Sequence, residues 1–395
     1  MHLLLTTSAD PPLHARPVEM VERKGFGHPD TLCDALAEQV SVALCRFYLE
    51  RFGTILHHNV DKVLLVGGRS APAFGGGEVL EPIDIYLAGR ATLEVRGVVV
   101  PIEQLAVESC RALLRRHVRN LDPERHVRLH LRIRPGSSEL ADLWLRKRAD
   151  DDWLANDTSC GTGFAPLTPT EQAVLRLERG LRSEAALRDH PERGEDIKVM
   201  AVRERERVSL TVADAFVDRA VDSLARYATL RDALRQDVRA LARCDELEVN
   251  CGDDLERGSI YLTVTGTSAE AGDDGEAGRG NRSSGLITPY RSMSMESVAG
   301  KNPVSHVGKI YNIAATRIAA DLVARIPAFE SVTCDLVSRL GRRVSDPQLV
   351  HVQCHLARGA AVADVQESAQ AIVTDHLARL SRLYEECLAG TAPIF

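Results

Sequence analysis

Two kinds of side chain recur near the glycine-rich turns of this sequence: acids that can bind a metal ion and bases that can bind phosphate. In the segment GFGHPD, His28 and Asp30 stand where a helix is expected to begin, since Pro29 suits the first helical turn. An acid at this place is often only a helix cap, because the N-terminus of a helix is positive. A histidine beside it, on a backbone that glycine makes adaptable, favours a chemical role as well.

The segment 265–282 concentrates glycines, carboxylates and arginines after an expected strand. It contains Asp273 and Arg279. Its glycines do not follow the G-x-G-x-x-G spacing of a dinucleotide site, and its acids do not follow the spacing of an EF-hand. A disordered linker therefore remains as the alternative to a ligand-binding loop.

A second basic segment surrounds the start of another expected helix. Lys301 follows Gly300, and His306 and Lys309 come shortly after it. The segment is not a Walker A motif, because no glycine stands five residues before Gly300 and no serine or threonine follows Lys301. Positive donors at a helix start still form a sound triphosphate site.

Two further segments carry candidate residues with plain alternatives. Asp157 lies in the polar, glycine-punctuated segment 156–163, which suits a turn as well as a ligand contact. Asp196 and Lys198 share one face of an expected strand, where such a pair is usually a surface ion pair of small energy. No Ser-His-Asp, Cys-His or zinc pattern is present, so the residues predict an enzyme that handles a nucleotide with Mg²⁺, its reaction unspecified.

Length and composition narrow the class of protein. A chain of 395 residues predicts two or three domains, and 49 basic against 56 acidic residues give a net charge of −7. That charge argues against nucleic acid as a partner, including at the basic segment 111–148. Nine cysteines without a C-x-x-C pair, no signal peptide and no membrane-spanning run predict a cytoplasmic protein.

The hydrophobic period changes in the same order three times along the chain. Each third is expected to contain a strand, a helix, two strands and a helix, which predicts an α+β fold of three similar domains, 1–122, 123–245 and 246–395. The expected strands are 18–24, 60–66, 83–88, 127–134, 197–202, 208–212, 259–265, 331–337 and 349–354. The expected helices begin after 29–30 and near 169, and otherwise span 102–117, 217–242, 303–325 and 362–388.

Long connections and one charged strand complete the expected framework. The segments 67–81, 134–169 and 266–302 follow strands and are long enough to be functional loops. In 127–134 apolar residues alternate with Arg128, His130, Arg132 and Arg134, so one face is cationic. That face is expected to be either a solvated strand edge or one wall of an anion-binding cleft.

At these motifs the sequence resembles the archaeal-type S-adenosylmethionine synthetase (methionine adenosyltransferase) family. The resemblance runs nearly end to end, and its motifs are long and ordered. The matching segments are 21–30 (VERKGFGHPD), 57–69 (HHNVDKVLLVGGR), 74–79, 194–200 (GEDIKVM), 263–270 (TVTGTSAE), 272–275, 278–282 (GRGNR) and 299–312 (AGKNPVSHVGKIYN).

The resemblance implies a fold, an assembly and a reaction. It implies three α+β domains of the form β-α-β-β-α around a pseudo-threefold axis, and a homodimer with active sites between subunits. Two Mg²⁺ ions and K⁺ are the implied cofactors. The implied reaction is attack of the L-methionine sulfur on C5′ of ATP, followed by cleavage of the released triphosphate to pyrophosphate and phosphate.

The resemblance also implies roles for individual residues. His28 corresponds to a histidine at the leaving oxygen and triphosphate, and Asp30 to a Mg²⁺ ligand. Asp157 and Asp273 correspond to methionine contacts, the latter alternatively to an adenosine contact. The nucleotide and triphosphate set is Asp196, Lys198, Arg279 and Lys301, with His306 and Lys309 as weaker members; His28, Lys198, Arg279 and Lys301 are the expected catalytic residues.

Departures from the bacterial and eukaryotic branch leave parts of the site open. Thr31 and Gly280 replace basic residues of that branch, Val307-Gly308 replaces a metal-binding aspartate, and Arg69 stands near the place of an ion-binding glutamate. These differences bear on the second Mg²⁺, on K⁺ and on the methionine pocket. Cys160 replaces an aromatic residue of the archaeal-type pattern.

Two other functions stay open on the sequence alone. In the first, the chain is a catalytically silent relative that binds nucleotide. In the second, it is an enzyme that uses another thioether as its substrate. The retained acids and bases favour an active enzyme over the first, and competition between L-methionine and longer S-alkyl homocysteines would distinguish the second.

Overall fold

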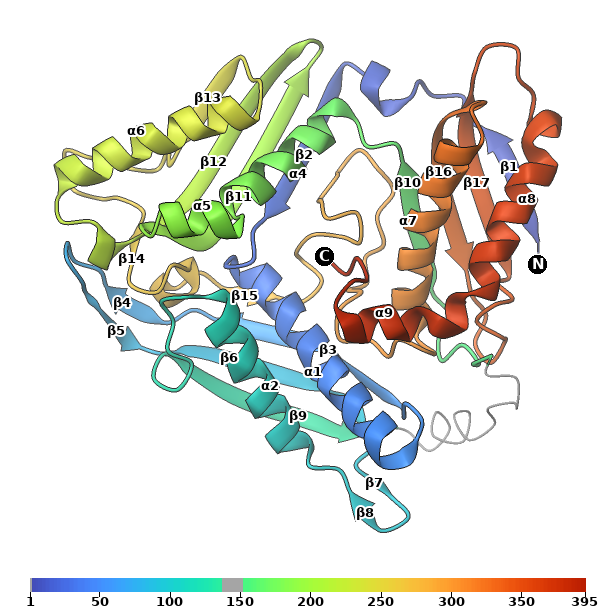
Figure 1. The fold of residues 1–395 in the computed structure, drawn as a ribbon, viewed down its shortest axis with the longest axis horizontal. Helices are drawn as coiled ribbons and strands as arrows, with labels where there is room; N and C mark the ends of the chain where they lie inside the picture. The colour runs from blue at the N-terminus through green and yellow to red at the C-terminus, as the bar shows by residue number, and fades with distance from the viewer. Residues whose placement is uncertain (1, 137–151) are drawn as a thin grey trace.

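The computed structural model describes residues 2–136 and 152–395. Within these residues the chain forms three main sheets and two short two-stranded ribbons, with helices packed on one face of each sheet (Figure 1). The fold class predicted from the hydrophobic periods, a mixed α+β protein, is confirmed. The domain limits at 122/123 and 245/246 stay a prediction.

The first sheet has the order β15-β3-β6-β9, and helices α1 and α2 cover it. Leu36, Leu65 and Ile85 are fully enclosed in the core between them. The elements of this part are α1 (Pro29–Phe52), β3 (His58–Val66), β4 (Arg69–Ala71), β5 (Glu78–Glu81), β6 (Ile83–Ala91), β7 (Glu94–Val95), β8 (Val98–Val99), α2 (Ile102–His117), β9 (Val127–Pro135) and β15 (Gly275–Glu276).

The second sheet has the order β13-β12-β11-β2, with β14 also paired to β12. Val199, Phe216 and Leu234 lie in its core. The elements of this part are β2 (Val18–Lys24), α4 (Pro169–Leu181), α5 (Glu184–Asp189), β11 (Arg193–Glu204), β12 (Arg207–Val217), α6 (Leu224–Leu241), β13 (Glu246–Val249) and β14 (Leu262–Thr263).

The third sheet has the order β1-β17-β16-β10 and packs against α7 and α8. Ile318, Val352 and Val373 lie in the core between sheet and helices. The elements of this part are β1 (Leu3–Thr7), β10 (Cys160–Ala165), α7 (Val307–Arg325), β16 (Phe329–Val337), β17 (Leu349–Leu356), α8 (Val362–Ala378) and α9 (Leu383–Ala389).

Strands cross between the three sheets in a regular way. The strand before α1 is β2, and it pairs with β11 of the second sheet. The strand before α4 is β10, and it pairs with β16 of the third sheet. The short strand before α7 is β15, and it pairs with β3 of the first sheet. Each sheet therefore takes an edge strand from a distant part of the chain, and the loops that follow these strands meet where the sheets adjoin.

Most expected elements are present, and two of them, β2 and α2, have the expected limits. The expected strand 259–265 is wrong for most of its length, since only Leu262–Thr263 pairs with β12. The carboxylate of Glu270 accepts the backbone N–H groups of Val264 and Thr265 at 2.7 and 2.5 Å. These donors are consequently not available to a neighbouring strand.

Three expected helices have different limits. The helix expected over 303–325 begins only at Val307, with His306 as its cap. Helix 217–242 begins only at Leu224, because Val217 still belongs to β12 and Ser223 caps the helix by accepting the Arg226 N–H. The single helix expected over 362–388 is divided into α8 and α9 by a 3₁₀ turn at Leu380–Arg382. Leu377, Leu380 and Leu383 are all buried, and their spacing of three fits that tighter turn.

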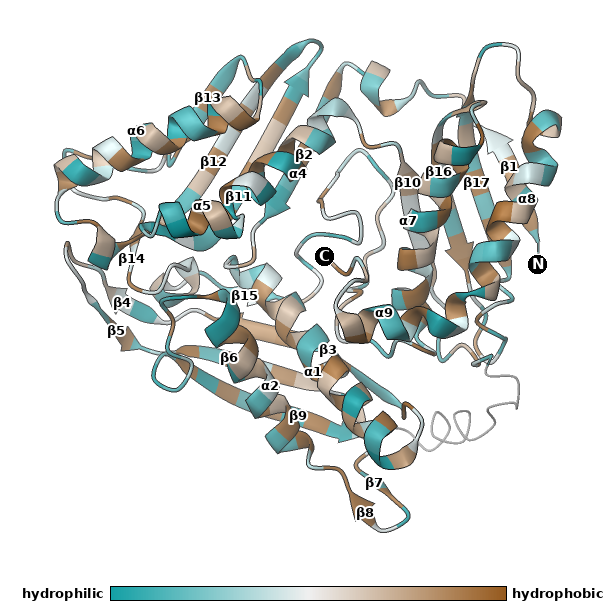
Figure 2. Cartoon of the chain, viewed as in Figure 1, coloured by the Kyte–Doolittle hydropathy of each residue, from teal (hydrophilic) through white to brown (hydrophobic). Residues whose placement is uncertain are grey.

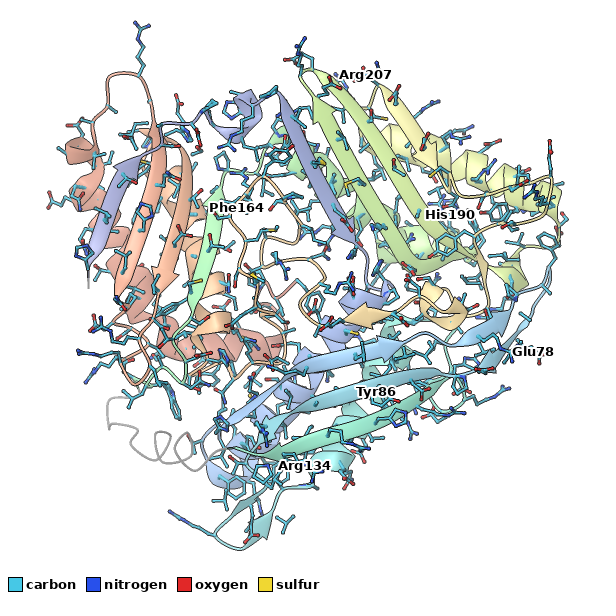
Figure 3. All side chains as sticks on the ribbon, turned by 180° about the vertical axis from the view of Figure 1, so that it is seen from behind. Glu78, Tyr86, Arg134, Phe164, His190 and Arg207 are labelled. Carbon is cyan, nitrogen blue, oxygen red and sulfur yellow. The ribbon has the colours of Figure 1, made fainter. Side chains whose placement is uncertain are left out.

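The strand β9 carries the cationic stretch at the edge of the first sheet. It is an edge strand parallel to β6, and Figure 2 shows hydrophobic and hydrophilic residues alternating along it. Leu129 and Leu131 pack against the core on the helix side. On the other face His130 hydrogen-bonds Asp84 at 2.7 Å and stacks on Tyr86 at 4.4 Å. The cationic face is therefore part of an open sheet surface (Figure 3).

The expected loop 156–163 is wrong in its second half, because β10 begins at Cys160. Its glycines allow α7 to lie directly on the strand: a Cβ on Gly161 would stand 2.1 Å from the carbonyl carbon of Tyr311, and one on Gly163 2.1 Å from the Thr316 nitrogen. Residues 137–151 of the expected loop 134–169 lie outside the described part of the chain. No described helix is long and apolar enough to cross a membrane.

Replacement Gly163→Ala tests the close contact between β10 and α7. The added methyl group would clash with helix backbone, which cannot move as a side-chain end does, so we expect a loss of at least about 1–3 kcal/mol of stability. Gly252→Ala is the matched control, since nothing lies within 4 Å of a Cβ at that position. Thermal unfolding of both variants checks the prediction, and equal midpoints would contradict it.

Candidate active site

The loop that carries His28 is fixed against the start of β11. Gly25 N–H donates to the Ile197 carbonyl at 2.7 Å, and Gly27 N–H donates to the Glu195 carbonyl at 3.0 Å. A Cβ on Gly27 would stand 2.4 Å from the Asp196 nitrogen. Glycine is thus required for this approach, which brings the N-terminus of α1 beside the strand carrying Asp196 and Lys198.

His28 is both the cap of α1 and the centre of a cationic environment. Its Nδ1 accepts the Asp30 N–H at 3.2 Å, so in the neutral ring the proton is on Nε2. Burial, together with the charges of Lys24, Lys198 and Arg279, lowers the pKa of His28 to about 4 against a smaller opposing effect of Asp30. The side chain is a neutral N–H donor at neutral pH.

Beside His28, two carboxylates converge on Lys24. Asp30 Oδ2 accepts from Lys24 Nζ at 2.7 Å, and Asp30 Oδ1 accepts the Glu276 N–H at 2.9 Å. Burial alone would raise the pKa of Asp30, but these hydrogen bonds lower it below its usual value. Glu22 Oε1 lies 3.7 Å from Lys24 Nζ and 3.2 Å from Lys198 Nζ.

This oxygen set fits a Mg²⁺ ion by its chemistry. Asp30 is ionised, and the buried Oε1 of Glu22 has no hydrogen-bond partner among the described residues. Mg²⁺ prefers a small number of carboxylate oxygens together with water and phosphate. Asp30 and Glu22 are accordingly the residues that could hold it.

Asp196 and Asp273 meet at one serine. Ser268 donates to Asp196 Oδ2 from its backbone at 2.9 Å and from its hydroxyl at 2.6 Å, and the same hydroxyl lies 2.9 Å from Asp273 Oδ2. Burial raises the pKa of Asp196 to about 6, although hydrogen bonds from Ser268 and Tyr261 oppose the rise. This pair adjoins the His28 loop, because Thr267 Oγ1 donates to the Gly27 carbonyl at 2.6 Å.

A polar cavity of about 520 Å³ gathers four of the other predicted residues, Asp157, Arg279, Lys301 and His306. Arg279 joins the cavity to the His28 group, since its charge acts on His28 and its carbonyl accepts from Lys24 Nζ at 3.2 Å. The cavity is also lined by residues that the motifs did not single out: Asn59, Asp61, Lys62, Val63, Leu64, Glu276, Ala277, Gly278, Met295, Glu296 and Ser297.

Lys301 is buried in this cavity and paired with acids. Its ammonium group donates to Asp61 and lies 3.6 Å from Glu296 Oε2. Burial alone would raise the pKa of Asp61, but the Lys301 charge lowers it. Asp61 therefore neutralises Lys301 in the free protein.

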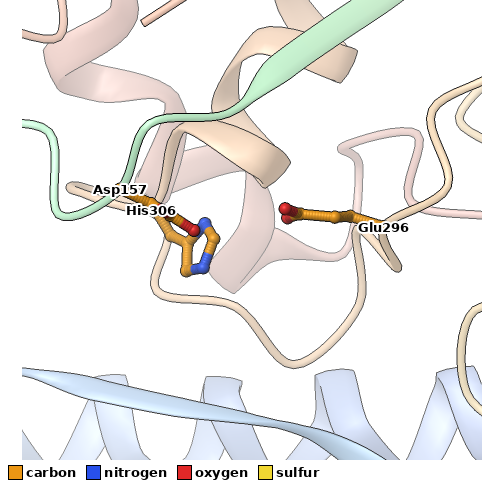
Figure 4. A group of neighbouring side chains, drawn as sticks. All are labelled: Asp157, Glu296 and His306. Atoms are coloured by element: carbon orange, nitrogen blue, oxygen red, sulfur yellow. The ribbon is translucent and has the colours of Figure 1, made fainter. Parts of the chain in front are cut away.

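Asp157, Glu296 and His306 all line the cavity, and their side chains lie close together (Figure 4). One ligand atom from each lies within 4.8 Å of the others. His306 caps α7 as His28 caps α1, since its Nδ1 accepts the Gly308 N–H at 3.2 Å. Burial and the nearby charge of Lys301 lower the pKa of His306 to about 3.

The histidine tautomer decides what this group can bind. Because Nδ1 is already an acceptor, the neutral ring carries its proton on Nε2 and offers no free lone pair to a metal. The two carboxylates with a neutral N–H donor suit the head group of an α-amino acid, which has one ammonium and one carboxylate. An amino acid fits this site better than Mg²⁺.

Lys309 lies outside the cavity lining. It is fully enclosed, and its ammonium group donates to both Glu38 oxygens, at 2.7 and 2.6 Å. Burial alone would lower the pKa of Lys309, but the charge of Glu38 raises it above the ordinary value. Its role as a triphosphate ligand stays a prediction of the resemblance.

The motifs missed several acids of the site. Asp61 had a usable signal, because it shares the inward face of β3 with Val63 and Leu65, and an acid at a core position requires a partner. Glu22 and Lys24 lie on β2 within a quoted motif, but their mutual contact with Lys198 depends on β2–β11 pairing. Glu296, in the segment MSME, had no such signal.

Comparison with known proteins gives consistent matches. The profile of the family described as S-adenosylmethionine synthetase matches residues 2–391. The chain is 48% identical over 393 residues to a protein of Aquifex aeolicus named probable S-adenosylmethionine synthase, with 98% of each chain covered. It is 45% identical to the S-adenosylmethionine synthase of Pyrococcus furiosus, with 97% of each covered.

A solved structure supports the fold alone. It is described as an unusual S-adenosylmethionine synthetase from Campylobacter jejuni, and it matches with a TM-score of 0.60 at 15% sequence identity. The match covers 95% of this chain and 94% of the other.

The depressed pKa values of His28 and His306 predict how stability depends on pH. Between pH 6.5 and 5 the unfolded chain binds protons on these rings and the folded chain does not, so their contribution to stability falls as pH falls, by up to about 1.4 kcal/mol per pH unit for each ring. Urea midpoints at pH 7 and pH 5 measure the loss. The double variant His28→Asn/His306→Asn should lose less; an equal loss would show that these rings are protonated when folded.

Proposed function

Because the chain belongs to the S-adenosylmethionine synthetase family, we infer that it is a methionine adenosyltransferase that makes S-adenosylmethionine from ATP and L-methionine. The methionine sulfur attacks C5′ of ATP, and the triphosphate that leaves is cleaved to pyrophosphate and phosphate. The observation that carries the inference is the cavity in which Arg279 and Lys301 lie with a carboxylate group suited to an amino acid, and in which Arg279 connects to the neutral donor His28.

The chemistry explains why the first step needs cations but requires no general base. A thioether sulfur is a nucleophile without a proton to lose, so the first step needs alignment and stabilisation of the leaving triphosphate. We assign the donation to the leaving oxygen to His28 Nε2–H. Lys198, Arg279 and Lys301 bind the triphosphate oxygens, and Asp196 and Asp273 bind the nucleoside side of ATP or the adjacent methionine.

Mg²⁺ belongs beside His28 in this proposal. Asp30 and Glu22 supply the oxygen ligands, and Lys24 holds both carboxylates in place. When bound, the metal neutralises charge that develops on the triphosphate. A second Mg²⁺ and K⁺ remain predictions of the resemblance, without a ligand set assigned to them.

The Asp157–Glu296–His306 group is the proposed site of the methionine head group. The two carboxylates take the ammonium group, and His306 Nε2–H donates to the α-carboxylate. His306 is thereby assigned to methionine; the resemblance places it, less firmly, on the triphosphate. The sulfur would then point along the cavity toward the His28 side.

We further propose the homodimer with its active sites at the subunit interface. The helices cover one side of the molecule, and the strands are open on the other (Figures 1 and 3). Leu64, Val66 and Tyr86 are 46%, 40% and 40% exposed on that open side, and Leu64 also lines the cavity. A second copy would cover apolar surface that is otherwise in water.

Two finer features belong to the same proposal. The repeated exchange of edge strands supports three similar domains around a pseudo-threefold axis. A cytoplasmic location is supported by the nine cysteines, all within the described residues and all unpaired. ATP and L-methionine are the proposed partners, and nucleic acid is not.

Replacement His28→Asn tests the leaving-group donor. Asparagine keeps an acceptor for the Asp30 N–H and so keeps the helix cap, but it loses the Nε2–H donor. We expect kcat for S-adenosylmethionine formation to fall about 10²–10³-fold. In Lys301→Ala we expect kcat to fall by at least the same factor. These kcat values are measured by mass-resolved analysis of S-adenosylmethionine, pyrophosphate and phosphate, with Mg²⁺ and K⁺ present.

The control and the contrary outcomes are direct. His14→Asn changes an exposed histidine far from the cavity in sequence and should behave as the parent. Parent-like turnover of both folded site variants would remove these residues from the mechanism. A parent protein that binds ATP without forming any product would instead favour a silent relative or another thioether substrate.

Replacement Glu296→Gln tests the methionine head-group site. Loss of one charge against the ammonium group should raise KM for L-methionine about tenfold or more, with a smaller change in kcat, because that contact is made in substrate and transition state alike. Glu367→Gln, on the exposed face of α8, is the control. An unchanged KM for L-methionine would refute the assignment of Glu296.

A further inference from the structure

Two side chains of helix α1 hydrogen-bond to the backbone of the segment that carries Lys301. Glu38 Oε2 accepts the Gly300 N–H at 2.9 Å, and Ser41 Oγ donates to the Lys301 carbonyl at 3.3 Å. Glu38 and Ser41 are three residues apart and so lie on one face of the helix. Both contacts are to main-chain atoms of Gly300 and Lys301, and the Lys301 side chain lines the cavity.

Gly300 is held from the other side as well. Its φ of +75° lies in the left-handed region, and its carbonyl accepts the Val60 N–H at 2.9 Å. A Cβ there would be 2.7 Å from the Val60 oxygen and 2.9 Å from the Ala37 methyl carbon. The residue is therefore wedged between α1 and β3, and the Glu38 contact satisfies its only N–H.

The charge of Glu38 is balanced by Lys309 of α7. Lys309 is fully enclosed and has both Glu38 oxygens within 2.7 Å. The Lys309 ammonium group is bound to Glu38 and is not part of the cavity lining. Its visible effect is to fix the carboxylate that receives the Gly300 N–H.

A second anchor supports the first. The Ser41 hydroxyl lies 2.7 Å from His58 Nε2, and Asn302 Nδ2 donates to the Leu56 carbonyl at 2.9 Å and lies 3.2 Å from His58 Nδ1. Ser41, His58 and Asn302 are all buried. The chain on both sides of Lys301 is thus tied to α1 and to the start of β3.

We propose that Glu38, with its charge balanced by Lys309, is a positioning residue that sets the place of Lys301 in the cavity. The proposal rests on the proposed function, in which Lys301 binds the leaving triphosphate. Glu38 acts through the Gly300 N–H and does not touch substrate. Lys309 then serves the reaction through Glu38, which replaces its expected role as a triphosphate ligand.

Two matched double variants test it. Glu38→Gln/Lys309→Met removes the buried ion pair but keeps an oxygen that accepts the Gly300 N–H. Glu38→Leu/Lys309→Met removes the same charges and that oxygen too. If the contact positions Lys301, kcat of the leucine variant should be at least about tenfold below that of the glutamine variant, since small misplacement of a catalytic group is costly, while KM for L-methionine differs little.

Every outcome decides the proposal. Equal kcat values in the two folded variants overturn it, and if both are then as low as Lys301→Ala, Lys309 is a ligand after all. Thermal midpoints of the two variants separate positioning from general instability. If the leucine variant fails to fold, Glu38→Ala/Lys309→Met takes its place, because it too removes both charges and the oxygen that accepts the Gly300 N–H; a kcat equal to that of the glutamine variant overturns the proposal. A parent enzyme that makes no S-adenosylmethionine would instead reject the proposed function.

Discussion

Cations that are gathered around one site repel one another, and the rest of this structure depends on how that repulsion is balanced. Lys24, Lys198 and Arg279 act on His28, and Arg279 also lines the cavity that holds Lys301. Coulomb energies rise as water is excluded, so each buried cation is placed beside an acid. Glu22 and Asp30 serve the first group, and Asp61 and Glu296 serve Lys301. These acids balance the charge of the cations until the phosphate oxygens of a bound nucleotide take their place.

The exchange of edge strands is what brings these charges to one place. Because β2 lies beside β11, Glu22 of one segment reaches Lys198 of another. Because β15 lies beside β3, the Glu276 N–H reaches Asp30, and Arg279 follows shortly after in the chain. The loops differ in length, and the residues that strand pairing brings together are more than a hundred positions apart in the chain. The sheets position the site more strictly than any one loop could.

Local patterns in the sequence predicted most of the elements but not their partners. The limits of β2 and α2 follow from periodicity alone, and glycine with proline at 25–29 predicts the start of α1. Gly161 and Gly163 could not be interpreted correctly from their neighbours, because their role is to admit α7, about 150 residues later. Likewise Asp157 and His306 were expected in the site, whereas Glu296 could be found only once the chain was folded around them.

The two histidines of the site share one local arrangement, a helix cap formed by the ring nitrogen Nδ1. His28 and His306 each cap a helix that follows an exchanged strand, and each gives its Nδ1 to a backbone N–H of the first turn. Burial keeps both rings neutral, and that bond places the proton of each ring on Nε2. A neutral donor adds no charge to a cavity already crowded with cations, and it cannot lose its proton at the pH of the cell. A lysine in either place would supply a stronger donor but would need a further acid to balance it.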